Sequence, residues 1–253
     1  MLVAVVAFTR GDGTESAATR IERCGDRAAC LRAVYDSAVE DGDVVQVLDA
    51  LQKRGGDCHL EAHRLAHAVY RDVGDVERTF LLGGPQCRFG YLHGAVEASG
   101  AVATSSARSV EGVAVPPCDR FRNPVQQRAC SHGFGHALML RTSNDLRSSI
   151  AGCGEAEQRY GLSAPSCRAG VMMENSLRYS GRQEFAAASA RGCRAVAGSK
   201  PLTELCFDNV GIVAALAVDH DLQRATALCG RLARVDQRAL CEGGAKGEIA
   251  EAR

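Results

Sequence analysis

The sequence predicts an all-α protein whose disulfide-stapled helical hairpins repeat along the chain as an α-solenoid. Apolar residues make up 46% of its 253 residues and aromatic residues only 5%, which favours closely packed helices over a β-sandwich. Four cysteines begin stretches rich in small and aliphatic residues, at intervals of 37, 39 and 35 residues. A period of this length is typical of stacked helical hairpins. The four are Cys130, Cys167, Cys206 and Cys241.

Residues 1–20 are interpreted as an apolar stub and linker, and residues 21–253 as a single helical repeat domain. Met1 to Phe8 are apolar, but eight residues cannot span a bilayer, which takes about 20. We interpret them as part of a secretory signal or of an N-terminal anchor, the alternative being a disordered end with chance aliphatics. Repeats share a continuous core, so no boundary is expected within 21–253.

The first half of the chain is expected to form helical hairpins that cysteines introduce. Asp41-Gly-Asp43 and Val73-Gly-Asp75 are turn signals between amphipathic stretches. Residues 99–117 are rich in Ser, Ala, Val and Gly and are predicted to be a loop. Helices are predicted over residues 31–40, 44–53 and 76–82 and from Cys58 and Cys87 onward.

The second half predicts a repeated unit of two helices. The first helix begins near a cap, as at Ser143 or Asp219, and ends near a cysteine. A loop of about ten residues follows, over 154–166 or 194–205, and the second helix begins near the next cysteine. The stretch from Asp145 to Cys153 aligns without gaps with the stretch from Asp221 to Cys229.

Twelve cysteines without a CxxC pair favour disulfides over a zinc ribbon, and therefore an oxidising, extracellular or periplasmic location. The alternative is a set of buried reduced thiols. Pairing the end of each first helix with the start of its second helix closes short loops. This rule predicts Cys118–Cys130, Cys153–Cys167, Cys193–Cys206 and Cys229–Cys241. Cys24–Cys30 and the longer closure Cys58–Cys87 would complete the set.

Histidines and glutamates recur every four residues in three segments that each begin with a cysteine. On a helix this spacing puts them on one face, and equivalent helices of a repeat line one surface. Imidazole and carboxylate groups suit Zn, Fe or Cu, so we expect a metal site there. The candidate ligands are His59, His63, His93, Glu97, His132, His136 and Glu174.

Each of these residues also has a structural interpretation. A single HxxxH pair is usually a surface or core pair, and His67 is expected to lie at the periphery. His220 is interpreted as a turn or cap residue, and the methionines at 139, 172 and 173 as core packing. Gly133 and Gly135 indicate either a substrate groove or tight packing between helices.

Catalysis is left open, because HExxH, GxSxG and a phosphate-binding loop are absent from the sequence. A metal with an open position activates water. Glu97 or Glu174 would then be the general base and Tyr91 a proton donor.

Four motifs carry a resemblance to other proteins. CHLEAH, CRFGYLHG, CSHGFGHALM and CRAGVMMEN, within residues 58–176, resemble those of secreted, uncharacterised bacterial and archaeal proteins with Cys/His-Gly repeats. This resemblance implies a helical-repeat architecture and no particular activity. The hairpins are also similar in outline to TPR- and Sel1-like solenoids, but the TPR aromatic pattern is missing and those families lack this cysteine ladder.

These observations together predict an exported metal-binding helical repeat protein with a His/Glu site on consecutive helices. The alternative is a non-catalytic scaffold that binds a protein or peptide partner, with the histidines as polar core. Zero net charge and no basic stripe argue against a nucleic-acid partner. Membrane contact is expected only through an N-terminal anchor.

Overall fold

The computed structural model describes residues 15–54, 58–102, 108–181 and 184–251, and their regular structure is almost entirely helical. The prediction of an all-α protein is confirmed. The α-helices are α1 Ala17–Cys24, α2 Ala28–Ser37, α3 Val44–Arg54, α4 Cys58–Val73, α5 Val76–Leu82, α6 Gly90–Val102, α7 Pro124–Arg141, α8 Leu146–Tyr160, α9 Ala164–Leu177, α10 Phe185–Cys193, α11 Lys200–Leu216, α12 Leu222–Cys229 and α13 Val235–Glu251. Short 3-10 helices cover Cys118–Arg120 and Arg194–Val196, and β1 Ser109–Val110 pairs antiparallel with β2 Val113–Ala114.

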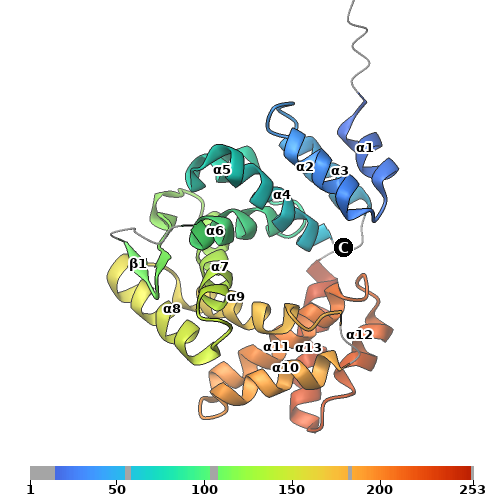
Figure 1. Cartoon of the computed structure of the whole chain (residues 1–253). Coiled ribbons are helices and arrows are strands. Elements are labelled where there is room, and N and C mark those ends of the chain that lie inside the picture. The colour runs from blue at the N-terminus through green and yellow to red at the C-terminus, as the bar shows by residue number, and fades with distance from the viewer. Residues whose placement is uncertain (1–14, 55–57, 103–107, 182–183, 252–253) are drawn as a thin grey trace, which may run out of the picture.

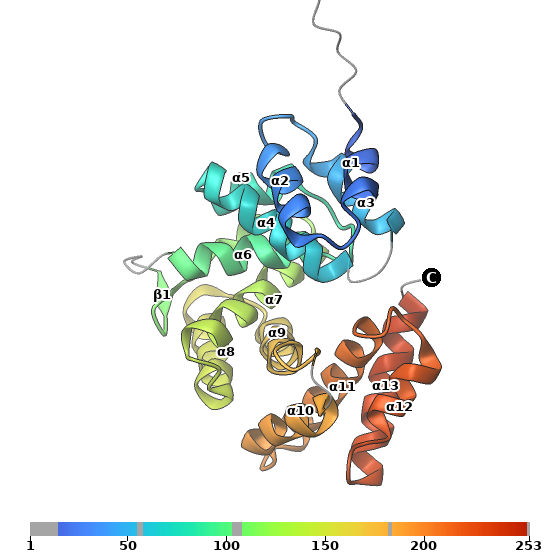
Figure 2. The same cartoon turned by 45° about the vertical axis from the view of Figure 1, so that its right-hand side comes forward.

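Six helices form the backbone of the fold, because each packs against the next. The order is α4, α6, α7, α9, α11 and α13, with the shorter helices attached at the sides. Figures 1 and 2 show this succession from α4 in teal to α13 in red. One hydrophobic cluster extends from Ala17 in α1 to Cys241 in α13 and connects these helices.

All six predicted disulfides are present in the structure, and the described residues include no free cysteine. Cys153–Cys167 joins α8 to α9, and Cys229–Cys241 joins α12 to α13. Disulfides persist in oxidising environments, so the six bonds indicate such a compartment. The bonds are Cys24–Cys30, Cys58–Cys87, Cys118–Cys130, Cys153–Cys167, Cys193–Cys206 and Cys229–Cys241.

Glycines let the long helices approach each other closely. A methyl group at Gly170 of α9 would overlap the carbonyl oxygen of His132 in α7. A methyl at Gly244 of α13 would overlap the carbonyl of Asp208 in α11 in the same way. Gly135 likewise lies against the carbonyl of Cys167, so tight packing between helices accounts for the glycines of α7.

The α7–α9 and α11–α13 hairpins share one register. His132 and Asp208 each lie two residues after their cysteine, and His136 and Ile212 each lie six after it. In the second helices, Glu174 and Glu248 each lie seven residues after the cysteine. These pairs are called repeat-equivalent positions below.

Several predicted helix boundaries are wrong because the helices extend further than predicted. The predicted loop 154–166 is mostly helix, because α8 continues through good helix formers to Tyr160. The second helices begin before their cysteines, at an Asn or Ser followed by a proline in the first helical turn. These starts are Asn123-Pro124, Ser163-Ala-Pro165 and Ser199-Lys-Pro201.

The helix caps of the repeat also lie two residues later than predicted. Asp145 and Asp221 cap α8 and α12 through their side chains. Ser143 and Asp219 instead have positive φ angles of 55° and 54° and belong to the preceding turns. The predicted loop 99–117 differs too, because α6 continues to Val102 and the β-hairpin follows.

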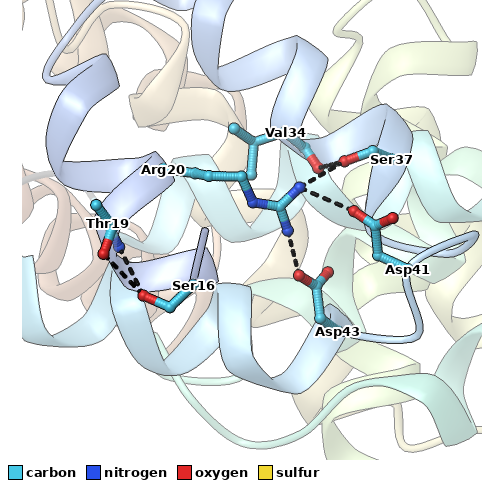
Figure 3. A network of polar contacts seen from close by, with 7 residues as sticks. All are labelled: Ser16, Thr19, Arg20, Val34, Ser37, Asp41 and Asp43. Atoms are coloured by element: carbon cyan, nitrogen blue, oxygen red, sulfur yellow. Dashed lines mark hydrogen bonds and ion pairs between the residues drawn. The ribbon is translucent and has the colours of Figure 1, made fainter. Parts of the chain in front are cut away.

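An ion-pair network holds the first three helices together (Figure 3). Arg20 of α1 donates to Ser37 Oγ at 2.9 Å and to Asp41 Oδ2 at 2.8 Å, and it also pairs with Asp43. The apolar segment Met1–Phe8 lies outside the described residues. Among the described helices, none is long and apolar enough to cross a membrane.

Candidate metal centre

Five histidines from three successive helices meet in the interior and are called the five-histidine cluster. Neighbouring rings have centroid distances from 4.4 Å, for His93 and His132, to 6.0 Å, for His93 and His136. All are buried except His132, which is half-buried. The members are His59 and His63 of α4, His93 of α6, and His132 and His136 of α7.

The helix packing explains why these side chains meet. The spacing of four places His59 above His63 on α4 and His132 above His136 on α7. Gly94 of α6 lies directly against the backbone of His63, and Gly133 of α7 lies against that of His93. The three backbones are therefore close enough for short imidazole side chains to reach a common point.

Hydrogen bonds fix one nitrogen of three of these rings. The Nδ1–H of His63 donates to Glu97 at 2.8 Å, and the Nδ1–H of His136 donates to Glu174 at 2.9 Å. The Nδ1–H of His59 donates to the carbonyl of Cys87 at 3.0 Å. A carboxylate or carbonyl oxygen can only accept, so Nδ1 carries the proton in each neutral ring. The Nε2 atoms then present lone pairs.

Five of the remaining nitrogens have no proton donor to accept from among the described residues. The Nε2 atoms of His59 and His63 face each other at 3.2 Å. Three further enclosed nitrogens have no hydrogen-bond partner among the described residues. They are His93 Nδ1, His132 Nε2 and His136 Nε2. Unsatisfied buried polar atoms are costly, so three such nitrogens in one cluster mark it as a candidate ligand site.

Burial and neighbouring charges favour the neutral form of four of these rings. Burial lowers the pKa of His59, His93 and His132 well below the ordinary value, and the neighbouring histidines lower it further. Burial also lowers the pKa of His63, although its bond to Glu97 opposes this. Neutral imidazole is the form that binds metals.

Glu97 is ionised in this environment. Burial alone would raise its pKa, but hydrogen bonds from His63 and His67 outweigh burial and hold the pKa well below the usual range. A carboxylate that accepts from Nδ1–H of a histidine fixes the tautomer and makes Nε2 a better donor to a metal.

The donor geometry suits a transition metal ion. In one trio the nitrogens of His59, His63 and His93 lie within 4.8 Å of one another. In a second trio those of His93, His132 and His136 do the same. Zinc–nitrogen bonds of about 2.0–2.1 Å put tetrahedral ligands about 3.3 Å apart, close to the distance between His59 and His63.

All seven predicted ligands are brought together here, in two kinds of position. The histidines point their nitrogens at one another, whereas Glu97 and Glu174 bind the far side of His63 and His136. Whether each residue ligates a metal stays a prediction. Each glutamate accepts a hydrogen bond from Nδ1 of one histidine and so fixes the orientation of that ring.

The other candidates have different surroundings. The hydroxyl of Tyr91 donates to the carbonyl of Thr79 at 2.9 Å, and burial raises its pKa, so it joins α5 to α6. His67 lies at the edge, 37% exposed and 3.4 Å from Glu97. His220 is a turn residue with φ 61° and lies 3.2 Å from Glu248.

The three methionines predicted to be core packing are all buried. Met139 and Met172 are fully buried in the core. Met173 also lines the cleft beside the histidines.

Two hollows reach different members of the cluster. A cleft of about 740 Å³ is lined by His59, His93 and His132 and extends to α11 and α13. A pocket of about 220 Å³ is lined by His63, Glu97 and Glu174. The cleft offers the wider approach to the imidazole nitrogens.

One contributor was missed by sequence reasoning. The Cys87 carbonyl that fixes His59 is a backbone group, and its residue has a positive φ of 52°. No side-chain pattern announces such a contact. The repeated glycines, by contrast, signalled the close packing that brings the helices together.

Comparison with family models, with curated proteins and with solved structures finds no match for this chain. The geometry of the five-histidine cluster is therefore the basis for a functional interpretation.

Proposed function

We propose that this chain is an exported metal-binding protein whose five-histidine cluster holds a transition metal: zinc, iron or copper. The observation that carries the proposal is the 3.2 Å separation of the Nε2 atoms of His59 and His63. Both rings use Nδ1–H for a hydrogen bond elsewhere, so two lone pairs face each other. A cation between them turns this repulsion into two bonds.

The chemistry of the donors supports the same class of ion. Neutral imidazoles suit Zn, Cu and Fe, and second nitrogens bound to carboxylates are typical of histidines that ligate metals. Three protein ligands leave a coordination position open, and the cleft of about 740 Å³ leads to it. A metal with an open position polarises a bound water or substrate.

Export and repetition belong to the same proposal. Six disulfides require an oxidising compartment, so we place the protein outside the cytoplasm, extracellular or periplasmic. The segment Met1–Phe8 would be part of a signal or an anchor. Shared register and close glycine contacts in successive hairpins support descent from one solenoid-forming unit.

The test is a metal titration of the tag-free protein after purification from an oxidising compartment and removal of metal by a chelator. Zn²⁺ is added in competition with a chromophoric chelator. We expect tight binding by the wild type and strong loss in His63→Gln. Asp208→Asn, altered at the position repeat-equivalent to His132, should bind as the wild type does.

Helical circular dichroism and the absence of free thiols would establish that each variant is folded. Equal affinity of the wild type and His63→Gln would refute the proposal. So would a folded wild type without affinity for Zn²⁺, Cu²⁺ or Fe²⁺. The histidines would then be polar core in a scaffold.

A further inference from the structure

The five-histidine cluster contains two trios of nitrogens and not one group of five. The trio of His59, His63 and His93 and the trio of His93, His132 and His136 have only His93 in common. The nitrogens of each trio lie within 4.8 Å of one another, whereas no such set among the described residues contains all five histidines. A single ion therefore leaves some of these histidines without a metal to bind.

Each trio contains its own set of unsatisfied donors. In the first trio, the Nε2 atoms of His59 and His63 face each other. In the second, the Nε2 atoms of His132 and His136 are enclosed without a partner among the described residues. One ion bound in the first trio would leave the two enclosed nitrogens of the second unsatisfied.

Each trio also has one histidine backed by a carboxylate. Glu97 accepts from His63 in the first trio, and Glu174 accepts from His136 in the second. The two carboxylates come from different helices, α6 and α9. One negative charge close to each trio offsets part of the charge of a divalent cation there.

His93 is placed to serve both trios. Its ring lies 5.4 Å from that of His59 on one side and stacks on that of His132 at 4.4 Å on the other. Its Nδ1 is enclosed and has no partner in the described chain. A neutral imidazole offers one lone pair, so the second ion would displace the N–H proton of His93 to solvent, and the resulting imidazolate would bind one ion at each nitrogen.

We propose that the cluster is a two-metal centre in which two transition metal ions share His93. This inference depends on the proposed metal binding and adds the number of ions and the role of His93. The open coordination positions of the two-metal centre would face the cleft, because His59, His93 and His132 line that cleft.

The first test is the stoichiometry of Zn²⁺ in the chelator competition. The wild type should bind two ions, whereas His63→Ala and His136→Ala should each bind one, in the trio that remains complete. His93→Ala should weaken both ions by more than the roughly 10–100-fold that loss of an outer partner costs. His220→Ala is the matched control, because His220 pairs with Glu248 outside both trios, and it should still bind two.

The second test separates a shared ring from two independent sites. Copper(II) is loaded to saturation and its electron paramagnetic resonance signal is integrated. Two Cu²⁺ ions joined by one imidazole should be coupled, so the wild type should show much less signal than its copper content. His63→Ala, with one ion, should show the full signal.

The outcomes distinguish this inference from the proposed function. One ion per wild-type chain, lost in His63→Ala, would overturn the two-metal centre and leave metal binding in place. Two ions with full, uncoupled signal would overturn the sharing of His93. No ion in the folded wild type would overturn both proposals.

Discussion

The α7–α9 and α11–α13 hairpins have the same construction and different chemistry. In both, a disulfide ties the second helix to the intervening helix, α8 or α12, and a glycine packs against a carbonyl. At the repeat-equivalent positions, His132 and His136 of α7 correspond to Asp208 and Ile212 of α11. The scaffold therefore forms without histidines, and packing alone does not explain them.

The glutamates make the contrast sharper. Glu174 accepts from His136, whose other nitrogen has no partner among the described residues. Its repeat equivalent, Glu248, is buried and pairs with Arg88 and His220. In α11–α13 the carboxylate ends an ion-pair network, whereas in α7–α9 it supports a ring that has a free lone pair.

The Arg20 network differs from the five-histidine cluster in its charges. There a guanidinium meets two carboxylates and a hydroxyl, so opposite charges attract (Figure 3). In the five-histidine cluster, the Nε2 acceptors of His59 and His63 face each other. A cation placed between these nitrogens would supply the opposite charge that the Arg20 network already contains.

The largest expected effect is that of metal on stability. Free Zn²⁺ at about 1,000 times its dissociation constant should raise the free energy of unfolding by about 4 kcal/mol. A His132→Asp/His136→Ile variant, which gives α7 the residues of α11, should respond much less. Asp208→Asn should respond as the wild type does. Thermal unfolding with Zn²⁺ and with a chelator measures this, and equal shifts in both variants would contradict it.

The next effect concerns the glycine contacts that both hairpins share. Gly170→Ala and Gly244→Ala should each cost about 1–3 kcal/mol, because the methyl group overlaps a carbonyl oxygen. Gly243→Ala, at a helical position with open space, should be neutral or stabilising. Only Gly170→Ala should also weaken metal binding, because it displaces His132. Urea unfolding and the metal titration measure the two effects, and similar costs at Gly243 and Gly244 would refute the packing argument.

A separate effect is the pH dependence of the metal-free protein. Four histidines have folded pKa values below the ordinary one, so below about pH 6.5 the unfolded chain binds more protons. The unfolding free energy should be highest above pH 6.5 and fall as pH drops, by up to about 1.4 kcal/mol per unit for each histidine. The four are His59, His63, His93 and His132.

Urea unfolding between pH 8 and pH 5 measures this slope, and His132→Gln should make it shallower. An unchanged slope would show that the His132 ring does not contribute.

The smallest expected effect is the difference in metal affinity between variants of the two repeat-equivalent glutamates. Glu174→Gln should weaken metal binding by about 10–100-fold, because the amide supports His136 less well. Glu248→Gln should leave the metal affinity unchanged and act only on stability. The competition titration decides this, and equal losses in both variants would remove the special role of Glu174.

The sequence predicted the class, the disulfides and the residues of the cluster because each leaves a local signal. The cysteine period gave the pairing, and the spacing of four put His59 and His63 on one face. The predicted helix starts are wrong because the helices begin at a cap followed by a proline, Asn123-Pro124 and Ser199-Lys-Pro201, and not at the cysteines. The division into trios could not be predicted, because it depends on ring orientations fixed by Glu97, Glu174 and the Cys87 carbonyl.

The most direct test of the central claim is the metal content of the protein as purified, determined by mass spectrometry. Wild type and the His132→Asp/His136→Ile variant are produced tag-free in the same oxidising compartment and compared after circular dichroism has shown equal helicity. The account predicts stoichiometric transition metal in the wild type and a clear reduction in the variant. The same metal content in both, or none in a folded wild type, would contradict it.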